Sequence, residues 1–394
     1  MIKHILKLIW KRKAKNAFLT SEIALSFLVL FAVLSFVFSN LKRYYQPLGY
    51  DTEDIQLARI DFDALGEDSI KWVNTKKALK QELNQVNGIE HVSFSTSVAP
   101  FEDSQWTTGN ESDEPGAINF ESANLIITDE DYVDVYRPTL VAGRWYNDDD
   151  IKGKYKPIVV NKMFEERYLK DTTTLGLVIK FWNDEFIITG VVEYFKYLGE
   201  FAEEQPMLFP YLSEHSQQTS FATIRTASNV GPEIDKQIND VIEGVMKDVS
   251  FNVSKVDENR IRQSRRSWVP IVGLLSLCGF LIINVAMGLF GVLRYNISKR
   301  KGEIGLRKAL GAAPGNINAQ FVGEMLILTT LALIIGLLFA VQFPLLNFFQ
   351  VDQDVYIKAI VTALGIVYFL VFLCSLIPSA QAAAIDPATA LHEE

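Results

Sequence analysis

Two neighbouring stretches of the sequence decide the fold. Residues 268–293 read WVPIVGLLSLCGFLIINVAMGLFGVL, and residues 299–318 read KRKGEIGLRKALGAAPGNIN. The first stretch is apolar and, at about 1.5 Å per helical residue, long enough to cross about 30 Å of hydrocarbon. The second stretch is basic, as the cytoplasmic flank of a membrane span typically is. Together they predict an integral membrane protein.

The same apolar pattern occurs three more times in the chain. Membrane spans are predicted at residues 17–39, 321–343 and 359–377, and each holds at least 19 mostly apolar residues. The basic run before the first span also fits a signal peptide. However, its apolar stretch is too long and Phe38-Ser39-Asn40 is a poor cleavage site, so we expect an uncleaved anchor.

Charge is concentrated in three blocks. Residues 1–16 carry six basic and no acidic side chains, residues 42–266 carry 25 basic and 39 acidic ones, and residues 294–308 carry six basic ones and one acidic one. The overall net charge of −9 therefore averages two basic islands and one acidic block. This balance argues against nucleic acid as a partner.

The basic islands also predict the topology, because basic flanks of membrane spans stay in the cytoplasm. We expect both termini inside a multi-pass protein of the inner membrane, with a cytoplasmic tail at 378–394 and a cytoplasmic loop at 294–320. The acidic block 42–266 and a short loop at 344–358 are then outside. Four spans make this arrangement self-consistent.

The two ends of the outer block 42–266 follow the same pattern. Each end predicts a strand, a helix and a strand, at 55–62, 69–86 and 89–95 and again at 221–226, 232–249 and 251–256. In the first helix, the apolar stripe is Ile70, Val73, Leu79, Leu83 and Val86. We therefore expect one large α+β extracytoplasmic domain, with a split βαβ part made from both ends.

The middle of the block, about residues 97–219, is predicted to be a β-rich insertion into that domain. Strands are expected at 157–160, 177–181 and 186–193, a short helix capped by Asn161, and a loop over 102–116. Cys278 and Cys374, the two cysteines, both fall in predicted spans. The domain must therefore be held by its hydrophobic core rather than by disulfides.

The first 16 residues predict an amphipathic helix. Ile2, Ile5, Leu6 and Ile9 share one face and lysines occupy the other, which suits a helix lying on the lipid of the inner leaflet. A disordered basic segment is the alternative.

Motifs for catalysis are missing from the sequence. It contains no G-x-x-x-x-G-K-[ST] phosphate loop, no zinc-type spacing among its four histidines and no G-x-S-x-G elbow. We therefore predict no catalytic, cofactor-binding or metal-ligating residues in this chain. It should not hydrolyse ATP itself.

Polar and small residues inside the spans are candidate functional features. Glu22 and Glu324 are the clear carboxylates there, and they fit either packing near the cytoplasmic end or ion coupling. Ala332, Gly336 and Ala340 have the small-xxx-small spacing of close helix approach. This stripe is either a dimer face or a packing face for the chain's own spans.

The loop after the second span carries more than a topology signal. Glu303 and Arg307 are spaced to pair along a helix, and Ile304, Leu306 and Leu310 present apolar side chains beside these charges. Gly311 can end the helix before the proline that follows. A short rigid helix joined to two spans is suited to docking another protein and transmitting its motion.

This loop resembles the cytoplasmic signature of the MacB/FtsX-like permeases of ABC transporters, over Arg300 to Ala312. The resemblance extends to Ala142-Gly143-Arg144-Trp145, to the segments 158–161 and 188–193, and to the closing segment 385–391. Together these cover nearly the whole chain.

The resemblance implies a permease subunit that works as a dimer with a second copy or a paralogue. It implies a separate ABC ATP-binding subunit that holds ATP and Mg²⁺, and efflux by mechanotransmission to the outer domain, with a periplasmic adaptor and an outer-membrane channel as further partners. The signature residues expected to contact the ATPase are Glu303, Ile304, Leu306, Arg307 and Leu310.

Two other functions stay open on the sequence. One is an FtsX-like or lipoprotein-release-like regulator that transmits ATPase motion to an outer partner. The other is a membrane sensor that uses no ATPase. The tail carries Gln381-Ala382-Ala383-Ala384 and His392 where relatives often have Arg or Lys, which weakens the expectation that the tail contacts the ATPase or the inner leaflet.

Overall fold

The computed structural model describes residues 13–385, except residues 67, 97, 114–117, 171–172, 183, 214–218, 248, 347 and 349–350. The chain divides into two compact units. We call Met1–Lys42 with Trp268–Glu394 the membrane unit, and Arg43–Ser267 the head domain. The amphipathic helix expected at 1–16 and the closing segment from residue 386 lie largely or wholly outside the described residues.

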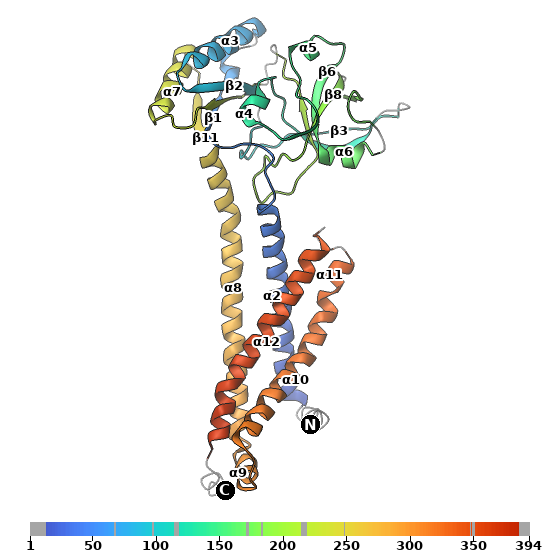
Figure 1. The fold of residues 1–394 in the computed structure, drawn as a ribbon, viewed down its shortest axis with the longest axis vertical. Helices are drawn as coiled ribbons and strands as arrows, with labels where there is room; N and C mark the ends of the chain where they lie inside the picture. Colours follow the sequence, from blue (N-terminus) through green and yellow to red (C-terminus); the bar gives the residue numbers. More distant parts are fainter. Residues whose placement is uncertain are drawn as a thin grey trace. The chain divides into compact units, whose positions relative to one another are not determined.

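Four helices of the described chain are long and apolar enough to cross a membrane, as expected (Figure 1). They are α2 (Lys13–Tyr44), α8 (Val256–Ser298), α10 (Pro314–Ala340) and α12 (Gln353–Ala384). Two short helices, α9 (Lys301–Ala309) and α11 (Gln342–Leu345), adjoin α10. The helices α2, α8 and α12 extend beyond their predicted spans at both ends, because helical hydrogen bonds continue into the polar flanks of a span. The helix α10 begins before its predicted span but ends at Ala340, ahead of the predicted residue 343.

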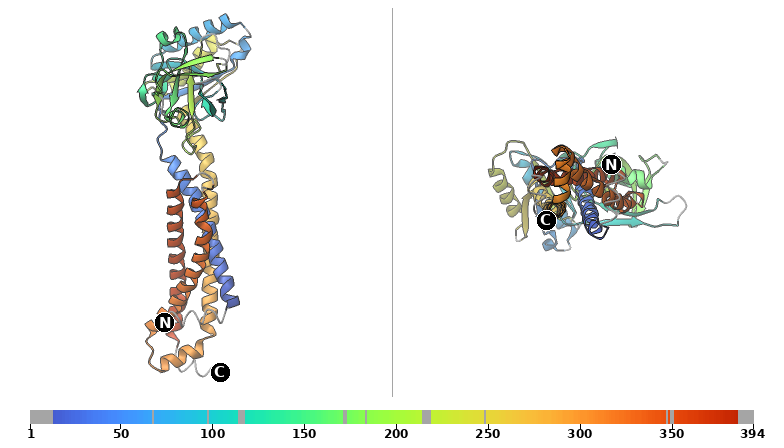
Figure 2. Two further views of the ribbon diagram at one scale, coloured as in Figure 1. Left: turned by 90° about the vertical axis from the view of Figure 1, so that its right-hand side faces the viewer. Right: turned by 90° about the horizontal axis from the view of Figure 1, so that it is seen from below.

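Within the membrane unit, α10 and α12 lie side by side, as both views of the ribbon show (Figures 1 and 2). The helix α2 buries Ile23 and Phe27 completely, and its Phe31 meets the ring of Phe343 at 5.6 Å between centroids. Aromatic packing thus joins the first span to the end of the third.

The ends of the head domain form a four-stranded sheet in the order β11-β1-β10-β2. Its strands are β1 (Ile55–Ile60), β2 (Ile89–Ser95), β10 (Phe221–Thr226) and β11 (Phe251–Lys255). Because β10 pairs antiparallel with both β1 and β2, the strands of each β-α-β unit are split by a strand from the other unit. This is the ferredoxin-like arrangement, and it agrees with the split βαβ part expected from the sequence.

The helices α3 (Ser69–Gln85) and α7 (Glu233–Val245) cover this sheet. Leu79 and Leu83 of α3 and Ile238 of α7 are fully buried in the same core. The predicted stripe is wrong at one position, since the Ile70 side chain is 68% exposed and Trp72 is buried instead. Ile70 lies in the first turn of α3, whereas the Trp72 indole reaches back to donate to the carbonyl of Gly66 at 2.7 Å.

The middle of the head domain forms a seven-stranded sheet in the order β3-β4-β9-β6-β8-β5, with β7 paired to β8. The strands are β3 (Thr107–Asn110), β4 (Phe120–Leu125), β5 (Leu140–Gly143), β6 (Lys156–Asn161), β7 (Val178–Phe181), β8 (Asp184–Val192) and β9 (Met207–Pro210). The short helices are η1 (Phe62–Leu65), which precedes α3, and α4 (Tyr132–Tyr136), α5 (Asp148–Ile151) and α6 (Lys162–Tyr168).

One prediction for this middle part is wrong. The segment 102–116 was expected to be a loop, but it contains β3, which pairs antiparallel with β4. Thr107 and Thr108 face Asn124 and Ala123 across this ladder. The pairing supplies backbone hydrogen bonds that the polar, acidic composition of the segment does not reveal.

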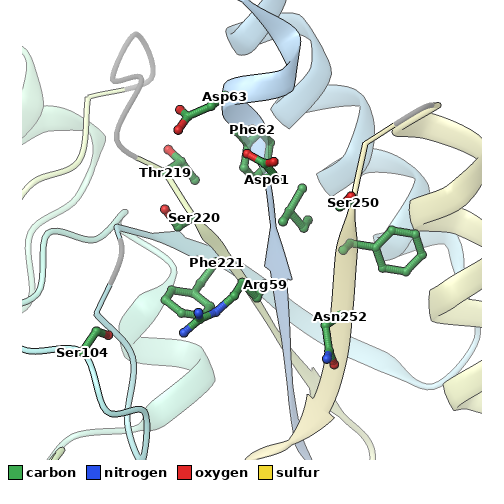
Figure 3. Close-up of a pocket in the computed structure, with 12 residues that line it drawn as sticks. Arg59, Asp61, Phe62, Asp63, Ser104, Thr219, Ser220, Phe221, Ser250 and Asn252 are labelled. Carbon is green, nitrogen blue, oxygen red and sulfur yellow. The ribbon is translucent and has the colours of Figure 1, made fainter.

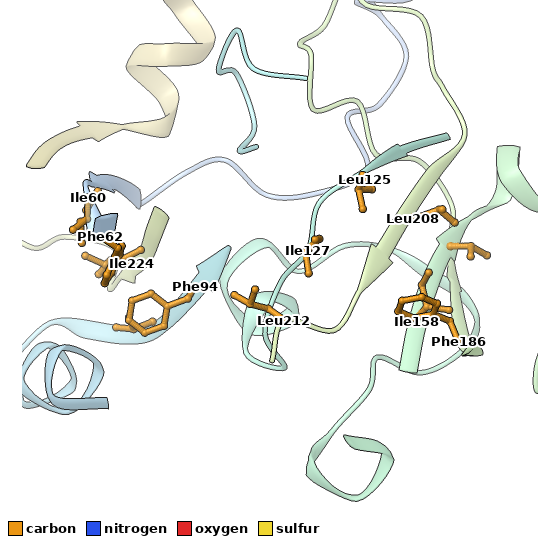
Figure 4. Close-up of a cluster of buried hydrophobic side chains, with 14 of the residues drawn as sticks. Ile60, Phe62, Phe94, Leu125, Ile127, Ile158, Phe186, Leu208, Leu212 and Ile224 are labelled. Carbon is orange, nitrogen blue, oxygen red and sulfur yellow. The ribbon is translucent and has the colours of Figure 1, made fainter. Parts of the chain in front are cut away.

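The head domain is held by two hydrophobic clusters. One runs from Phe62 and Ile224 of the first sheet region to Leu208 and Ile158 of the second (Figure 4). Half of the buried residues of the other cluster are aromatic, and Tyr132, whose side chain is fully buried in it, stacks on Trp145 at 5.9 Å between centroids. The burial of these side chains stabilises the domain, whereas small extracellular domains often depend on disulfides for stability.

A buried carboxylate joins the two sheets of the head domain. Asp129 follows β4 and accepts hydrogen bonds from Ser93 Oγ at 2.5 Å and Phe94 N at 2.8 Å, both on β2. Lys80 Nζ of α3 lies 3.7 Å from the same carboxylate. Burial outweighs these favourable contacts and raises the pKa of Asp129 to about 7.

This pKa predicts how stability depends on pH. Because the folded carboxyl is still protonated where the unfolded one is ionised, stability should fall between about pH 4 and pH 7 by at most about 1.4 kcal/mol per pH unit. The test is thermal unfolding of the full chain in detergent at several pH values between about 4 and 7, with tryptophan fluorescence as the readout. Asp129→Asn should remove this share of the slope; an unchanged slope would show that other groups cause it.

Candidate functional site

The loop helix α9 is built by local sequence. Glu303 and Arg307 form an ion pair of 2.5 Å one turn apart, which supports the helix on its exposed side. At its end, Ala312 N donates to Arg307 O and Gly311 N donates to Lys308 O, each at 3.0 Å. Gly311 has φ +93°, the left-handed conformation that this C-terminal motif requires. Pro314 then begins α10 at a position that needs no N–H donor.

The five residues expected to contact an ATPase do not share one environment. Leu306 and Leu310 are 53% and 79% exposed. The Glu303 and Arg307 side chains are also partly exposed, at 47% and 40%. Ile304 differs, because only 3% of it is exposed. Its side chain packs inside the chain and offers no exposed surface in this structure, so its contact with an ATPase stays a prediction.

Charged and amide groups connect α9 with the spans beside it. Arg307 Nη1 donates to Gln320 Oε1 at 2.6 Å. Arg300, just before α9, donates through Nη1 to both carboxylate oxygens of Glu324, at 2.9 and 3.0 Å. Lys308 Nζ donates to the carbonyl of Ala383, at 2.9 Å. Sequence spacing pointed to none of these tertiary contacts, since their partners lie 13 to 75 residues away.

The two carboxylates of the spans have different surroundings. Glu324 is paired with Arg300 at 2.9 Å, so its carboxylate has an oppositely charged partner within the chain. This favours the packing interpretation over ion coupling at Glu324. The Glu22 carboxylate lies against Gly288 of α8, where a Cβ atom would come within 2.9 Å of its Oε1.

The small-residue stripe of α10 packs within the chain. Ala332 and Ala340 are fully buried, and a Cβ atom added at Gly336 would meet Cδ1 of Phe27 at 2.5 Å. Glycine at position 336 therefore allows the ring of α2 to approach α10. Of the two roles open on the sequence, packing against the chain's own spans is the one that this contact supports.

The head domain holds a cavity of about 520 Å³ at the ends of three strands, shown in Figure 3. Arg59 of β1 lies over the ring of Phe221 of β10 at 5.1 Å and pairs with Glu102 at 2.6 Å. The carboxylates of Asp61 and Asp63 line the same cavity. Its volume is that of a small-molecule site. No sequence pattern points to this cavity, because residues about 160 to 190 positions apart supply its opposite walls.

Two family models match the chain. The MacB-like periplasmic core domain matches residues 23–241, more than half of the 394 residues, and the FtsX-like permease C-terminal domain matches residues 275–387. The chain belongs to the MacB/FtsX-like permease family. The FtsX-like match contains all of α9, α10 and α12, so the loop helix and its contacts are part of the family's permease domain.

Among proteins similar to this permease, the macrolide export ATP-binding/permease protein MacB of Neisseria meningitidis serogroup A is 24% identical over 287 residues, which are 69% of this chain and 44% of that protein. MacB 1/2 of Paracoccus denitrificans is 26% identical over 69% of this chain and 42% of its own length. The uncharacterized ABC transporter permease YvrN of Bacillus subtilis is 23% identical over 68% of this chain and 69% of its own length. This permease thus spans less than half the length of the MacB relatives it matches.

Two solved structures are similar to part of this permease. The periplasmic region of MacB from Actinobacillus actinomycetemcomitans covers 57% of the chain with a TM-score of 0.38 and 18% identity. The extracellular domain of the ABC-type transporter YknZ covers 51% with a TM-score of 0.34 and 15% identity.

The stripe of α10 provides a test of the packing in this permease. Gly336→Val should destabilise the membrane unit by about 1–3 kcal/mol, because the added methyl groups must displace the Phe27 ring. The measurement is the midpoint of heat-induced aggregation of the full chain in detergent. Gly365→Val in α12 is the matched control, since nothing lies within 4 Å of a Cβ atom there. Equal midpoints for the two variants would contradict the packing.

Proposed function

We propose that this chain is the permease subunit of an ABC-type efflux machine. In this proposal a separate ATP-binding chain hydrolyses ATP and docks on α9, and the motion is transmitted to the head domain. No ATP or Mg²⁺ binds to the permease chain itself. The observation that carries the proposal is the exposure of Leu306 on α9 and of Leu310 directly after it, between two spans of a member of a permease family.

The surface chemistry of α9 supports docking of a protein. An exposed leucine pair beside a charged pair, Glu303 and Arg307, offers the apolar centre and polar rim of a small interface. Gly311 and the hydrogen bonds around it fix the end of the helix, so little conformational entropy is lost on binding.

The proposed topology follows from the distribution of charge. Residues 1–16 and 294–308 are strongly basic, and basic flanks favour the cytoplasmic side. In this proposal the N-terminus and α9 lie in the cytoplasm, where an ATP-binding chain is available. The C-terminus would lie on the same side, and the head domain, with its excess of acidic residues, outside. A second permease copy or a paralogue would complete a dimer, and an adaptor and an outer-membrane channel would extend the path outward.

Copurification tests the proposal. The full chain, purified from native membranes in mild detergent, should bring down an ABC ATP-binding subunit and its ATPase activity. The double variant Leu306→Asp/Leu310→Asp should reduce the recovered subunit at least about tenfold, the effect of about 1.4 kcal/mol in binding free energy. Ile70→Asp on α3 is the matched control, because Ile70 is similarly exposed but lies in the head domain.

The other outcomes separate the alternatives. Equal recovery with the double variant and the control would place the docking surface elsewhere. Recovery of the ATP-binding subunit together with a cell-wall hydrolase would favour a regulator over an efflux pump. Absence of any ATP-binding subunit would contradict the proposal and favour a sensor that uses no ATPase.

A further inference from the structure

The position of α9 is fixed by contacts near both of its ends. The helix covers nine residues, about 13.5 Å at about 1.5 Å per residue. One contact residue, Arg300, directly precedes its first residue, and another, Lys308, is its second-last residue. A helix held at one end can pivot, whereas a helix held at both ends keeps its direction relative to the elements that hold it.

The first anchor is the buried pair of Arg300 and Glu324 of α10. Their side chains are only 8% and 15% exposed, and one guanidinium nitrogen lies 2.9 to 3.0 Å from both carboxylate oxygens. The Arg300 guanidinium also lies 5.9 Å from the ring centroid of Phe321. A buried charge pair is costly to separate, because each partner would be left uncompensated.

Gln320 extends this anchor along the two helices. Its Nε2 donates to Glu324 at 3.2 Å, and its Oε1 accepts from Arg307 at 2.6 Å. Arg307 in turn pairs with Glu303. A continuous chain of polar contacts therefore leads from exposed Glu303 on α9 to the buried carboxylate of α10.

The second anchor is Lys308, at the end of α12. Its Nζ donates to the carbonyls of Ala383 and Ile385, at 2.9 and 2.6 Å. The last carbonyls of a helix lack hydrogen-bond donors within the helix, and the helix dipole makes this end partially negative. A lysine there donates hydrogen bonds to the carbonyls and brings a positive charge to the negative end. The two anchors bind α9 to two different spans.

The two spans are themselves joined by polar contacts. Ser379 of α12 donates to Asn318 of α10 near the α9 end, and the hydroxyls of Thr330 and Tyr368 lie 3.0 Å apart farther along. The helices also pack closely over much of their length (Figure 2). Thus α10 and α12 offer a common support for α9.

We infer that Arg300, Glu324 and Lys308 are positioning residues that fix α9 to α10 and α12, so that these three helices move as one body. The inference rests on the proposed function, which makes α9 the place where the ATP-binding chain acts. A displacement of α9 is then carried directly by the third and fourth spans. The docking leucines, Leu306 and Leu310, stay outside these contacts and remain free for the partner.

The test measures the distance between spin labels on α9 and α12 in the full chain, reconstituted in lipid nanodiscs. Labels are placed at Ala309→Cys and Gln381→Cys, both exposed positions, after replacement of Cys278 and Cys374 by serine. With Arg300, Glu324 and Lys308 unchanged, the distance distribution between the two labels should be narrow. Glu324→Gln and Lys308→Met should each lose it and give a broad distribution, because one end of α9 is released.

Two further variants make the result specific. Arg300→Glu with Glu324→Arg restores a pair of opposite charges and should recover the narrow distance, which a merely structural role of either side chain would not predict. Lys299→Met is the matched control, since Lys299 contacts the Tyr295 ring at 6.0 Å in α8 and not α12. A wild-type distribution as broad as that of the variants, or narrow distances in every variant, would overturn the inference.

The same samples separate this inference from the proposed function. Distances are measured without any partner chain, so a narrow wild-type distance that Lys308→Met broadens would support the fixed unit even if no ATP-binding subunit copurifies. Conversely, the ATP-binding subunit could copurify while the label distance stays narrow in both Glu324→Gln and Lys308→Met. That result would support docking on the permease and contradict the inference that these residues fix α9 to the spans.

Discussion

The membrane unit is governed by one constraint, which is that hydrocarbon offers no hydrogen bonds to the backbone or to charged groups. Its long elements are therefore helices that satisfy their own backbone groups. Charged side chains are rare within them, and Glu324 is paired with Arg300. The same constraint explains the hydroxyls, since Thr329 and Ser375 donate to carbonyls of their own helices. Polar groups in this unit are thus placed where a partner is within reach.

The head domain is subject to a different constraint. Water competes for its hydrogen bonds, and it has no cysteine with which to form a disulfide. Its stability depends on burial, and two clusters rich in aromatic side chains supply that burial. Each polar side chain that is buried with them needs a hydrogen-bond partner or an ion pair. Asp129 is one, and its raised pKa shows that the surrounding contacts do not fully compensate for the loss of water.

Most of the architecture could be predicted from the sequence, because apolar runs and the spacing of apolar residues within single helices and strands determine it. Four apolar runs predict four spans, and the alternation around Ile55 and Phe221 predicts the two similar ends of the head domain. The errors arose where tertiary contacts override local pattern. Ile70 has the right helical spacing but lies too near the start of α3 to be covered, and β3 is a strand because β4 pairs with it.

The residues of the candidate site also divide into those that local spacing could predict and those that depend on tertiary contacts. The pair Glu303–Arg307 and the end of α9 at Gly311 depend on neighbours within one turn, so spacing alone could predict them. Whether Ile304 or Leu306 faces outward depends on what lies beside α9, and sequence spacing could not decide it. The partners of Arg300 and Lys308 are even less predictable, because a buried guanidinium and a lysine on helix-end carbonyls have no characteristic spacing.

The division of labour within α9 follows from these surroundings. Charges and amides on the side of α9 toward α10 and α12 find partly buried partners, where a dielectric lower than that of water strengthens their interactions. The leucines that remain outside gain nothing from water and would gain from burial against another protein. One short helix can therefore be held firmly by polar contacts and still present an apolar surface. Glu303 and Arg307 belong both to the rim of the docking surface and to the polar contacts with α10, whereas Leu306 and Leu310 take no part in those contacts. A partner can therefore bury the two leucines without breaking the contacts that hold the helix.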